Sequence, residues 1–161
     1  MDYLWTPWRY RYISQVGDAE ACVFCAAGDP SADPRAMLVV HRGIHNFVIL
    51  NRFPYTSGHV MVVPYTHLAR LEDLTDETLV EMIRLAQRTE QVLRKVYRPE
   101  GINLGMNIGR SAGAGIAGHL HLHALPRWYG DSNFMTVVGE TRVVPEELET
   151  TWERLRAGFA A

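Results

Sequence analysis

Three histidines alternate with leucines in the stretch "GHLHLHALPRW" at positions 118–128. Side chains of an extended strand point alternately to its two faces, so His119, His121 and His123 share one face while the leucines between them point into a core. Imidazole can bind a metal ion, transfer a proton or act as a nucleophile. The stretch therefore predicts a strand with one chemically active face.

This row of histidines has three competing interpretations: a set with no role, a catalytic zinc bound by all of them, and a division of roles along the row. His119 and His123 are expected about 13 to 14 Å apart at Cα, too far to share a zinc ion with bonds of ~2.0 Å unless the strand bends sharply. A division of roles, with a metal at one end and chemistry at the centre, avoids this difficulty. His121 suits a nucleophile, because neutral imidazole attacks through one nitrogen when the other donates to a fixed acceptor.

The only two cysteines, Cys22 and Cys25, form the motif "CVFC". This spacing is used both by zinc sites and by redox dithiols. A redox dithiol of the thioredoxin kind follows a strand and opens a helix, whereas the flanks "GDAEA" and "AAGDPSADP" are rich in turn residues. The context favours zinc over a redox pair, with a chance pair of buried thiols as a third interpretation.

The loop before the histidines, "GAGIAG" from Gly113 to Gly118, matches the pattern G-x-G-x-x-G. A dinucleotide-binding fingerprint requires a helix to open at its third glycine, but the residues that follow alternate as in a strand. The pattern therefore does not indicate a Rossmann fold. Its glycines still allow backbone amides to approach an anion closely and form a phosphate-binding nest.

The elements that position these residues are short strands and two helices. Strands are predicted in "AMLVVHRG", "HNFVILN", "HVMVVPY", "INLGMNI" and the histidine stretch. One long helix is predicted from an N-cap at Thr75 to a point before Pro99, and a second at "PEELETTWERLRAGF", starting near Pro145. The long helix repeats apolar residues at helical spacing, namely Leu79, Met82, Ile83, Ala86, Leu93, Val96 and Tyr97. Strands on both sides of a single long helix predict an α+β fold, an antiparallel sheet of about five strands.

Length and composition predict one domain over residues 1–161, and a formal net charge of −2 gives no basic field for a nucleic-acid polymer. No secretory signal and no apolar run of ~20 residues is found, so a cytoplasmic protein with no membrane partner is expected. We divide the chain into an N-terminal arm with the cysteine motif (1–30), a core (36–128) and a C-terminal extension (129–161). The aromatic residues 1–14 are expected to pack on the core or on a partner subunit.

Taken together, these motifs resemble the histidine triad (HIT) family, which is marked by His-x-His-x-His with apolar spacers. The resemblance covers "CVFC", "FVILNRFPYTSGHVMVVPYTH", the long helix and "NIGRSAGAGIAGHLHLHALPRW". Within the family the chain looks closest to the bacterial diadenosine tetraphosphate phosphorylase-like branch, which pairs an "LWTPWR"-like start with an "AGAGI" loop and a "PRW" ending. The resemblance implies a HIT-like fold and a protein that is commonly a homodimer or a higher homo-oligomer.

The family's chemistry is a nucleotidyl transfer in two steps. The resemblance implies that His121 attacks the α-phosphorus of a nucleotide and that water or inorganic phosphate then releases the covalent intermediate. It also implies substrate contacts: His123 and loop amides near Gly113 and Gly115 on the phosphates, Asn51 on the ribose, and Asn107 near the phosphates. His59 would either support the triad by hydrogen bonding or be a satisfied core histidine. His41 and His45, which flank a turn, are expected at the surface.

Zinc-bearing members of the family use four ligands, which here are Cys22, Cys25, His67 and His119. Four closed ligands make a structural site, which would join the N-terminal motif to the histidine strand.

One departure from the family concerns the glycine loop, because many members have Ala-Gly-Gln where this chain has Ala-Gly-Ala-Gly at 112–115. The missing glutamine favours the phosphorylase-like branch. We expect cleavage of dinucleoside polyphosphates, with phosphorolysis preferred to hydrolysis. The alternatives are a phosphoramidate or diadenosine tetraphosphate hydrolase of the same family, a nucleotide-binding module with little turnover, and a zinc hydrolase that uses the triad as ligands.

Overall fold

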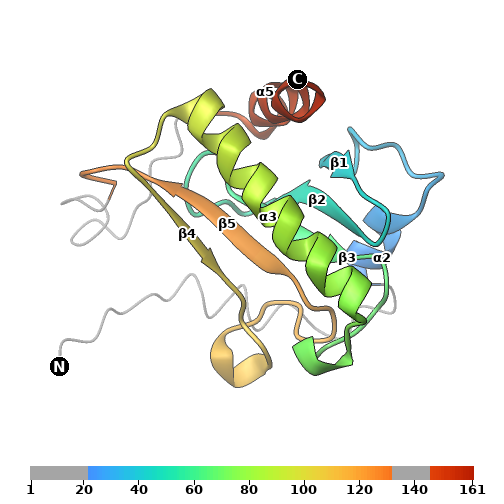
Figure 1. Ribbon diagram of the computed structural model, residues 1–161. Helices are drawn as coiled ribbons and strands as arrows, with labels where there is room; N and C mark the ends of the chain where they lie inside the picture. Colours follow the sequence, from blue (N-terminus) through green and yellow to red (C-terminus); the bar gives the residue numbers. More distant parts are fainter. Residues whose placement is uncertain (1–21, 132–145) are drawn as a thin grey trace, which may run out of the picture.

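The computed structural model describes residues 22–131 and 146–161. The predicted aromatic arm and Pro145 lie outside these residues. Five strands form one antiparallel sheet in the order β1-β2-β3-β5-β4, as predicted, and Figure 1 shows it with α3 lying across one face. The strands are β1 (Val39–Arg42), β2 (Asn46–Leu50), β3 (Val60–Pro64), β4 (Gly101–Gly105) and β5 (Leu122–Arg127), and the α-helices are α2 (Val23–Gly28), α3 (Asp76–Tyr97) and α5 (Leu148–Ala160). Among the described residues, no helix is long and apolar enough to cross a membrane.

The long helix α3 begins and ends as the sequence predicts. The Thr75 side chain accepts a hydrogen bond from the Thr78 amide at 3.3 Å, which is the expected N-cap. The buried stripe consists of Thr78, Met82, Leu85, Ala86, Thr89, Val92 and Leu93. Ile83, one of the apolar residues that recur at helical spacing, is 56% exposed and does not belong to this stripe. It directly follows Met82, about 100° further round the helix, and therefore falls outside the stripe.

Helix α5 begins at Leu148, after an N-cap at Glu147, a few residues later than predicted. It covers strand β1, because Trp152 Nε1 and Arg156 Nη1 donate to the carbonyl oxygens of Val39 and Val40. His41, which was expected at the surface, is half-buried, because its ring stacks on Phe159 with centroids 5.1 Å apart. Because α5 supplies that partner from the far end of the chain, local turn residues could not predict it.

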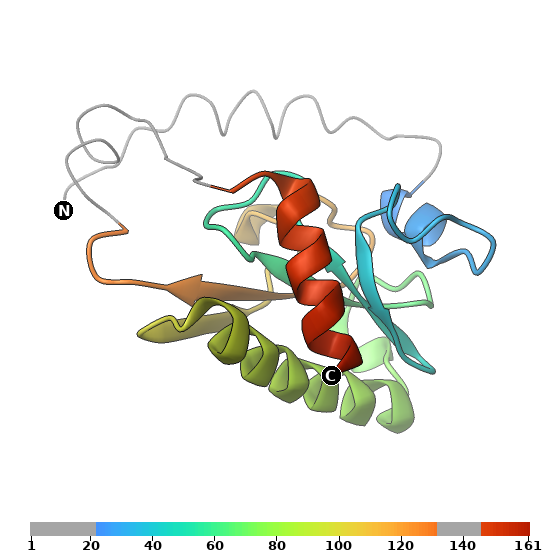
Figure 2. The ribbon, with the colours of Figure 1, turned by 90° about the horizontal axis from the view of Figure 1, so that it is seen from above.

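The sheet separates two apolar clusters. One lies between the sheet and helices α3 and α5 and includes Val60, Val62, Leu122 and Ala124. The other lies on the opposite face under α2 and includes Phe24, Phe47, Ile49, Met61 and Val63. Figure 2 shows α2 beyond the sheet on the side away from α3. Met61 pairs with His123 in the register of β3 and β5, so the histidine face of β5 is the α2 face.

Strand β5 starts later than the histidine pattern predicts. Its first residue is Leu122, and the Leu120 amide donates to the Leu68 carbonyl rather than to β3. The partner strand β3 ends at Pro64, which has no amide hydrogen to extend the ladder. His119 and His121 therefore lie just before the strand, and only His123 lies in the strand.

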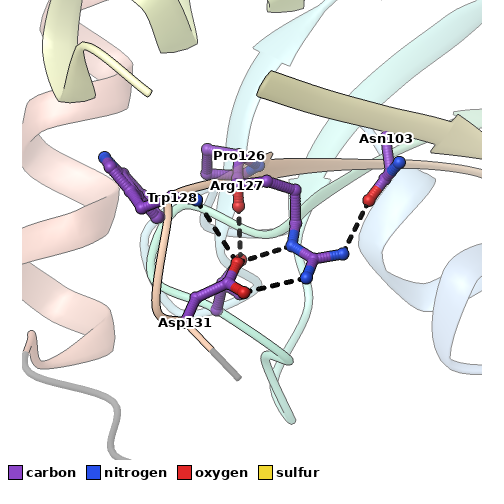
Figure 3. A network of polar contacts seen from close by, with 6 residues as sticks. Asn103, Pro126, Arg127, Trp128 and Asp131 are labelled. Carbon is purple, nitrogen blue, oxygen red and sulfur yellow. Dashed lines mark hydrogen bonds and ion pairs between the residues drawn. The ribbon is translucent and has the colours of Figure 1, made fainter. Parts of the chain in front are cut away.

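The far end of β5 is joined to β4 by a polar network (Figure 3). Arg127 donates through Nε and Nη2 to the two carboxylate oxygens of Asp131 at 2.6 and 2.9 Å, and through Nη1 to Asn103 Oδ1 at 2.8 Å. The Trp128 amide donates to the same carboxylate. A forked guanidinium of this kind fixes geometry well, so the turn after β5 is tied to the neighbouring strand.

Candidate active site and metal cluster

The ring of His121 is held by its own backbone neighbour. Its Nδ1 lies 2.8 Å from the carbonyl oxygen of His119, and because a carbonyl only accepts, Nδ1 carries the hydrogen. Nε2 therefore has a free lone pair when the ring is neutral. Burial lowers the pKa of His121, and the hydrogen bond to His119 opposes this only in part. The side chain is thus a neutral imidazole whose Nε2 lone pair is available for a proton, a metal ion or an electrophile.

A hydrogen bond between two imidazoles fixes the tautomer of His123. The Tyr55 amide donates to Nδ1 of His59 at 3.2 Å, so neutral His59 carries its hydrogen on Nε2. That Nε2 lies 2.9 Å from Nδ1 of His123 and donates to it. His123 therefore presents Nε2–H on its other side. Burial, with a smaller contribution from His121, lowers the pKa of His123 to about 4, which keeps this donor neutral at ordinary pH.

His59 was expected either to support the triad or to be a satisfied core histidine, and the structure combines the two. His59 is 1% exposed and is satisfied by hydrogen bonds, yet its partner is a triad histidine. The Tyr55 ring lies 4.7 Å from the His59 ring and stacks over His123 at 6.3 Å. We call Tyr55, His59 and His123 the relay. Tyr55 was missed by sequence reasoning, because an aromatic residue in a loop gives no sign that its amide fixes a tautomer.

A separate cluster collects the predicted metal ligands, Cys22, Cys25, His67 and His119, whose candidate ligand atoms all lie within 4.8 Å of one another. His119 Nδ1 lies 3.3 Å from Cys22 Sγ, and His67 Nδ1 lies 3.2 Å from Cys25 Sγ. His119 Nε2 donates to the Pro64 carbonyl at 2.9 Å, which leaves Nδ1 unprotonated and facing the sulfurs. Histidines that bind metal ions usually donate their other ring N–H to a carbonyl or carboxylate, which fixes the tautomer and the ring orientation.

The donor set fits zinc, because two thiolates and two imidazoles at this separation match the preferred tetrahedral ligands. Burial and a hydrogen bond that the Cys25 thiol donates to Cys22 raise the pKa of Cys25, and a bound cation would reverse that direction by stabilising the thiolate. Between the turn-rich flanks, Cys22 is the N-cap of the short helix α2 and Cys25 lies within it. Arg42 holds the end of this short helix by donating to the carbonyls of Ala27, Gly28 and Asp29.

The remaining predicted site residues lie in loops around the histidines. Asn51 follows β2, accepts a hydrogen bond from the Phe53 amide through Oδ1 at 2.9 Å, and places Nδ2 3.5 Å from His59 Nε2. Asn107 follows the end of β4, where Gly105 pairs with His123. The structure thus brings Asn51 to the relay and puts Asn107 just beyond the neighbouring strand.

The glycine loop contains a short 3-10 turn, η2 (Arg110–Ala112). Gly113 closes the turn with φ +89°, a conformation that favours glycine. Its amide donates to the Arg110 carbonyl at 2.9 Å. Of the two predicted loop glycines, Gly115 is therefore the candidate for an amide contact to a phosphate.

Comparison with known proteins agrees with this geometry. Residues 36–129 match the HIT domain. The chain belongs to the HIT domain family. It is 40% identical over 163 residues to the "AP-4-A phosphorylase" of Mycobacterium tuberculosis, covering 98% of this chain and 84% of the relative, which confirms the predicted family and branch.

Two solved structures share the family's fold. A zinc-bound histidine triad family protein from Mycobacterium smegmatis superposes with a TM-score of 0.70 at 31% identity and covers 88% of this chain and 94% of its own. A histidine triad nucleotide-binding protein from Sulfolobus tokodaii superposes with a TM-score of 0.69 at 26% identity and covers 86% and 92%. The α+β fold predicted from the sequence is therefore confirmed.

Proposed function

We propose that this protein cleaves dinucleoside polyphosphates such as diadenosine tetraphosphate by nucleotidyl transfer through His121, with inorganic phosphate as the preferred acceptor. The observation that carries the proposal is the hydrogen bond from His121 Nδ1 to the His119 carbonyl, because it leaves Nε2 as a fixed nucleophile. The 40% identity to a protein named AP-4-A phosphorylase supports the substrate class.

In the first step, the Nε2 lone pair of His121 forms a bond to the α-phosphorus of diadenosine tetraphosphate. The bond from that phosphorus to the bridging oxygen breaks, and ATP leaves with the electron pair. The Nε2–H of His123 donates to a phosphate oxygen that gains charge, a contribution of a few kcal/mol when the donor is preorganised. Asn51 binds the ribose, while Asn107 and the Gly115 amide contact the phosphates.

In the second step, an oxygen of inorganic phosphate attacks the phosphorus of the nucleotidyl-histidine. The P–N bond breaks, its electron pair returns to Nε2 of His121, and ADP is released. Water in place of phosphate would give AMP. Dividing one difficult displacement into two easier ones is the advantage of covalent catalysis.

The metal cluster has a structural role in this proposal. Cys22, Cys25, His67 and His119 hold one zinc ion, which supplies a cross-link between α2 and the segment that carries His121. Zinc analysis should find about one ion per chain. An active protein that holds no metal would contradict this assignment.

The homodimer expected from the family remains a prediction. Strand β4 lies at an edge of the sheet and pairs only with β5 among the described strands, and Leu104 on it is 49% exposed. Light scattering after gel filtration would give the oligomeric state.

Product analysis tests the proposed function. The protein is incubated with diadenosine tetraphosphate, with and without inorganic phosphate, and the nucleotides are identified. ADP and ATP that appear only with phosphate support the phosphorylase. AMP and ATP in both incubations would indicate a hydrolase, and no cleavage in either would contradict this substrate class, leaving a binding module.

A further inference from the structure

One of the two residues between the cysteines, Phe24, contacts the proposed nucleophile. Phe24 lies in α2 and is 3% exposed. Its ring centroid is 5.0 Å from that of His121 and 5.4 Å from that of His119. A single aromatic side chain thus contacts one residue of the metal cluster and the proposed nucleophile.

We propose that Phe24 is a positioning residue whose ring holds the imidazole of His121 at the angle that keeps its Nδ1–H on the His119 carbonyl. This inference rests on the proposed function, since it concerns the residue that attacks phosphorus.

One hydrogen bond does not by itself fix the plane of a ring. The bond to the His119 carbonyl restrains Nδ1 of His121 but permits rocking about the side-chain torsions, which would move Nε2. Two ring contacts restrict that motion: the Phe24 ring, tilted by 48°, and the His123 ring, with its centroid 4.8 Å away at 76°. Such aromatic contacts prefer tilted or edge-on geometry. Nε2 is therefore held in place by a hydrogen bond and two flanking rings.

The position of Phe24 is itself fixed by the surrounding structure. Its ring belongs to the apolar cluster with Phe47 and Met61, in a close-packed interior that resists displacement. Its helix is held at the end by Arg42, and the N-cap Cys22 and the helical residue Cys25 of the metal cluster lie on either side of Phe24 in the sequence. The cluster therefore acts on the nucleophile through two routes, the backbone of His119 and the ring of Phe24.

Phe47 offers a matched control. It lies in the same apolar cluster, is fully buried, and contacts Tyr65 with ring centroids 5.2 Å apart and a tilt of 32°. Among the described residues, its ring makes no ring contact with a histidine. Phe24→Leu and Phe47→Leu remove the same atoms from one cluster, so loss of packing alone should affect both alike. Only Phe24→Leu removes a ring from His121.

The test measures kcat at saturating diadenosine tetraphosphate and phosphate, zinc content, and the ring nitrogen NMR signals of His121. Phe24→Leu should lower kcat about tenfold and Phe24→Ala about a hundredfold, with zinc retained in the leucine variant and with mixed tautomer signals from His121. Phe47→Leu should destabilise the protein but leave kcat within about twofold and the His121 signals unchanged. Equal losses of kcat in the two leucine variants, or a wild-type kcat and spectrum in Phe24→Leu, would overturn the proposal.

The same measurements separate failure of this inference from failure of the proposed function. If the wild-type protein does not turn over, the proposed function fails, while the His121 spectra of wild type and Phe24→Leu still decide the positioning role. If the wild type turns over and the variant matches it in rate and spectrum, only the positioning role fails.

Discussion

The imidazole of His119 donates to the Pro64 carbonyl through Nε2 and turns Nδ1 toward two sulfur atoms, whereas the imidazole of His123 accepts from His59 through Nδ1 and presents Nε2–H. The two residues come from one short segment and are both buried. The partner of one ring nitrogen therefore decides what the other nitrogen offers: a carbonyl partner leaves a lone pair, as the proposed zinc ligand requires, and a histidine donor leaves a hydrogen, as the proposed phosphate contact requires. His121 lies between them, has a carbonyl partner, and so keeps the lone pair that the proposed attack requires.

Loss of the proposed nucleophile should give the largest effect, and it should separate catalysis from metal binding most clearly. His121→Asn should lower turnover of diadenosine tetraphosphate by about 10⁵-fold, because no other described side chain offers the same fixed nitrogen, while zinc content stays unchanged. Steady-state kinetics and metal analysis check both halves. His45→Asn, a histidine outside the cluster and the relay, should leave turnover unchanged. Loss of zinc together with activity in His121→Asn would favour a zinc hydrolase instead.

Disruption of the metal cluster should lower the free energy of unfolding more than it affects the catalytic step. Cys25→Ser removes one of four ligands and should cost several kcal/mol of unfolding free energy, a part of the roughly 10 kcal/mol that a structural zinc ion supplies. Urea denaturation measures it. Ala26→Ser places the same side chain on the next residue of α2 and should leave the transition near its wild-type position. A Cys25→Ser variant with wild-type stability and zinc content would contradict the assignment.

Disruption of the relay should lower kcat without affecting zinc binding. His59→Phe keeps a buried ring but removes the donor to His123, and an unmade buried hydrogen bond costs about 1–3 kcal/mol. We expect kcat to fall about tenfold to a hundredfold with zinc retained, because His123 is then free to change tautomer. Ring nitrogen shifts of His123 report the tautomer directly. An unchanged kcat would show that the relay does not orient a catalytic donor.

The smallest expected effect is a dependence of the unfolding free energy on pH, which arises from His123 in the relay. The pKa of His123 is lowered from 6.5 to about 4 by burial, so between these values the unfolded chain binds more protons than the folded chain. The contribution of His123 to the free energy of unfolding should therefore be greatest above pH 6.5 and should decrease as the pH falls toward 4. Denaturation at a series of pH values measures this slope, and His123→Gln should reduce it. Equal slopes in the two proteins would contradict the lowered pKa.

The sequence predicts the strands, the α3 boundaries and the members of the Cys/His cluster, because each depends on a local pattern or on a family motif. It places His119, His121 and His123 on one strand, but β3 ends at Pro64, and this long-range pairing sets where β5 begins. The helix of six residues that follows Cys22 was not predicted, because its flanks are rich in turn residues. Its stability comes from distant partners such as Arg42 rather than from helix propensity. His41 and Tyr55 were misjudged or missed for the same reason, since their partners lie elsewhere in the chain.

The most direct test of the division of roles is to locate the covalent intermediate. The zinc-loaded protein is mixed with diadenosine tetraphosphate without inorganic phosphate, quenched within one turnover, digested under conditions that preserve P–N bonds, and analysed by peptide mass spectrometry. We predict an adenylyl group on His121 that disappears when phosphate is added before the quench and is absent from His121→Asn. An adduct on His119 or His123, or steady turnover with no adduct at all, would contradict the account.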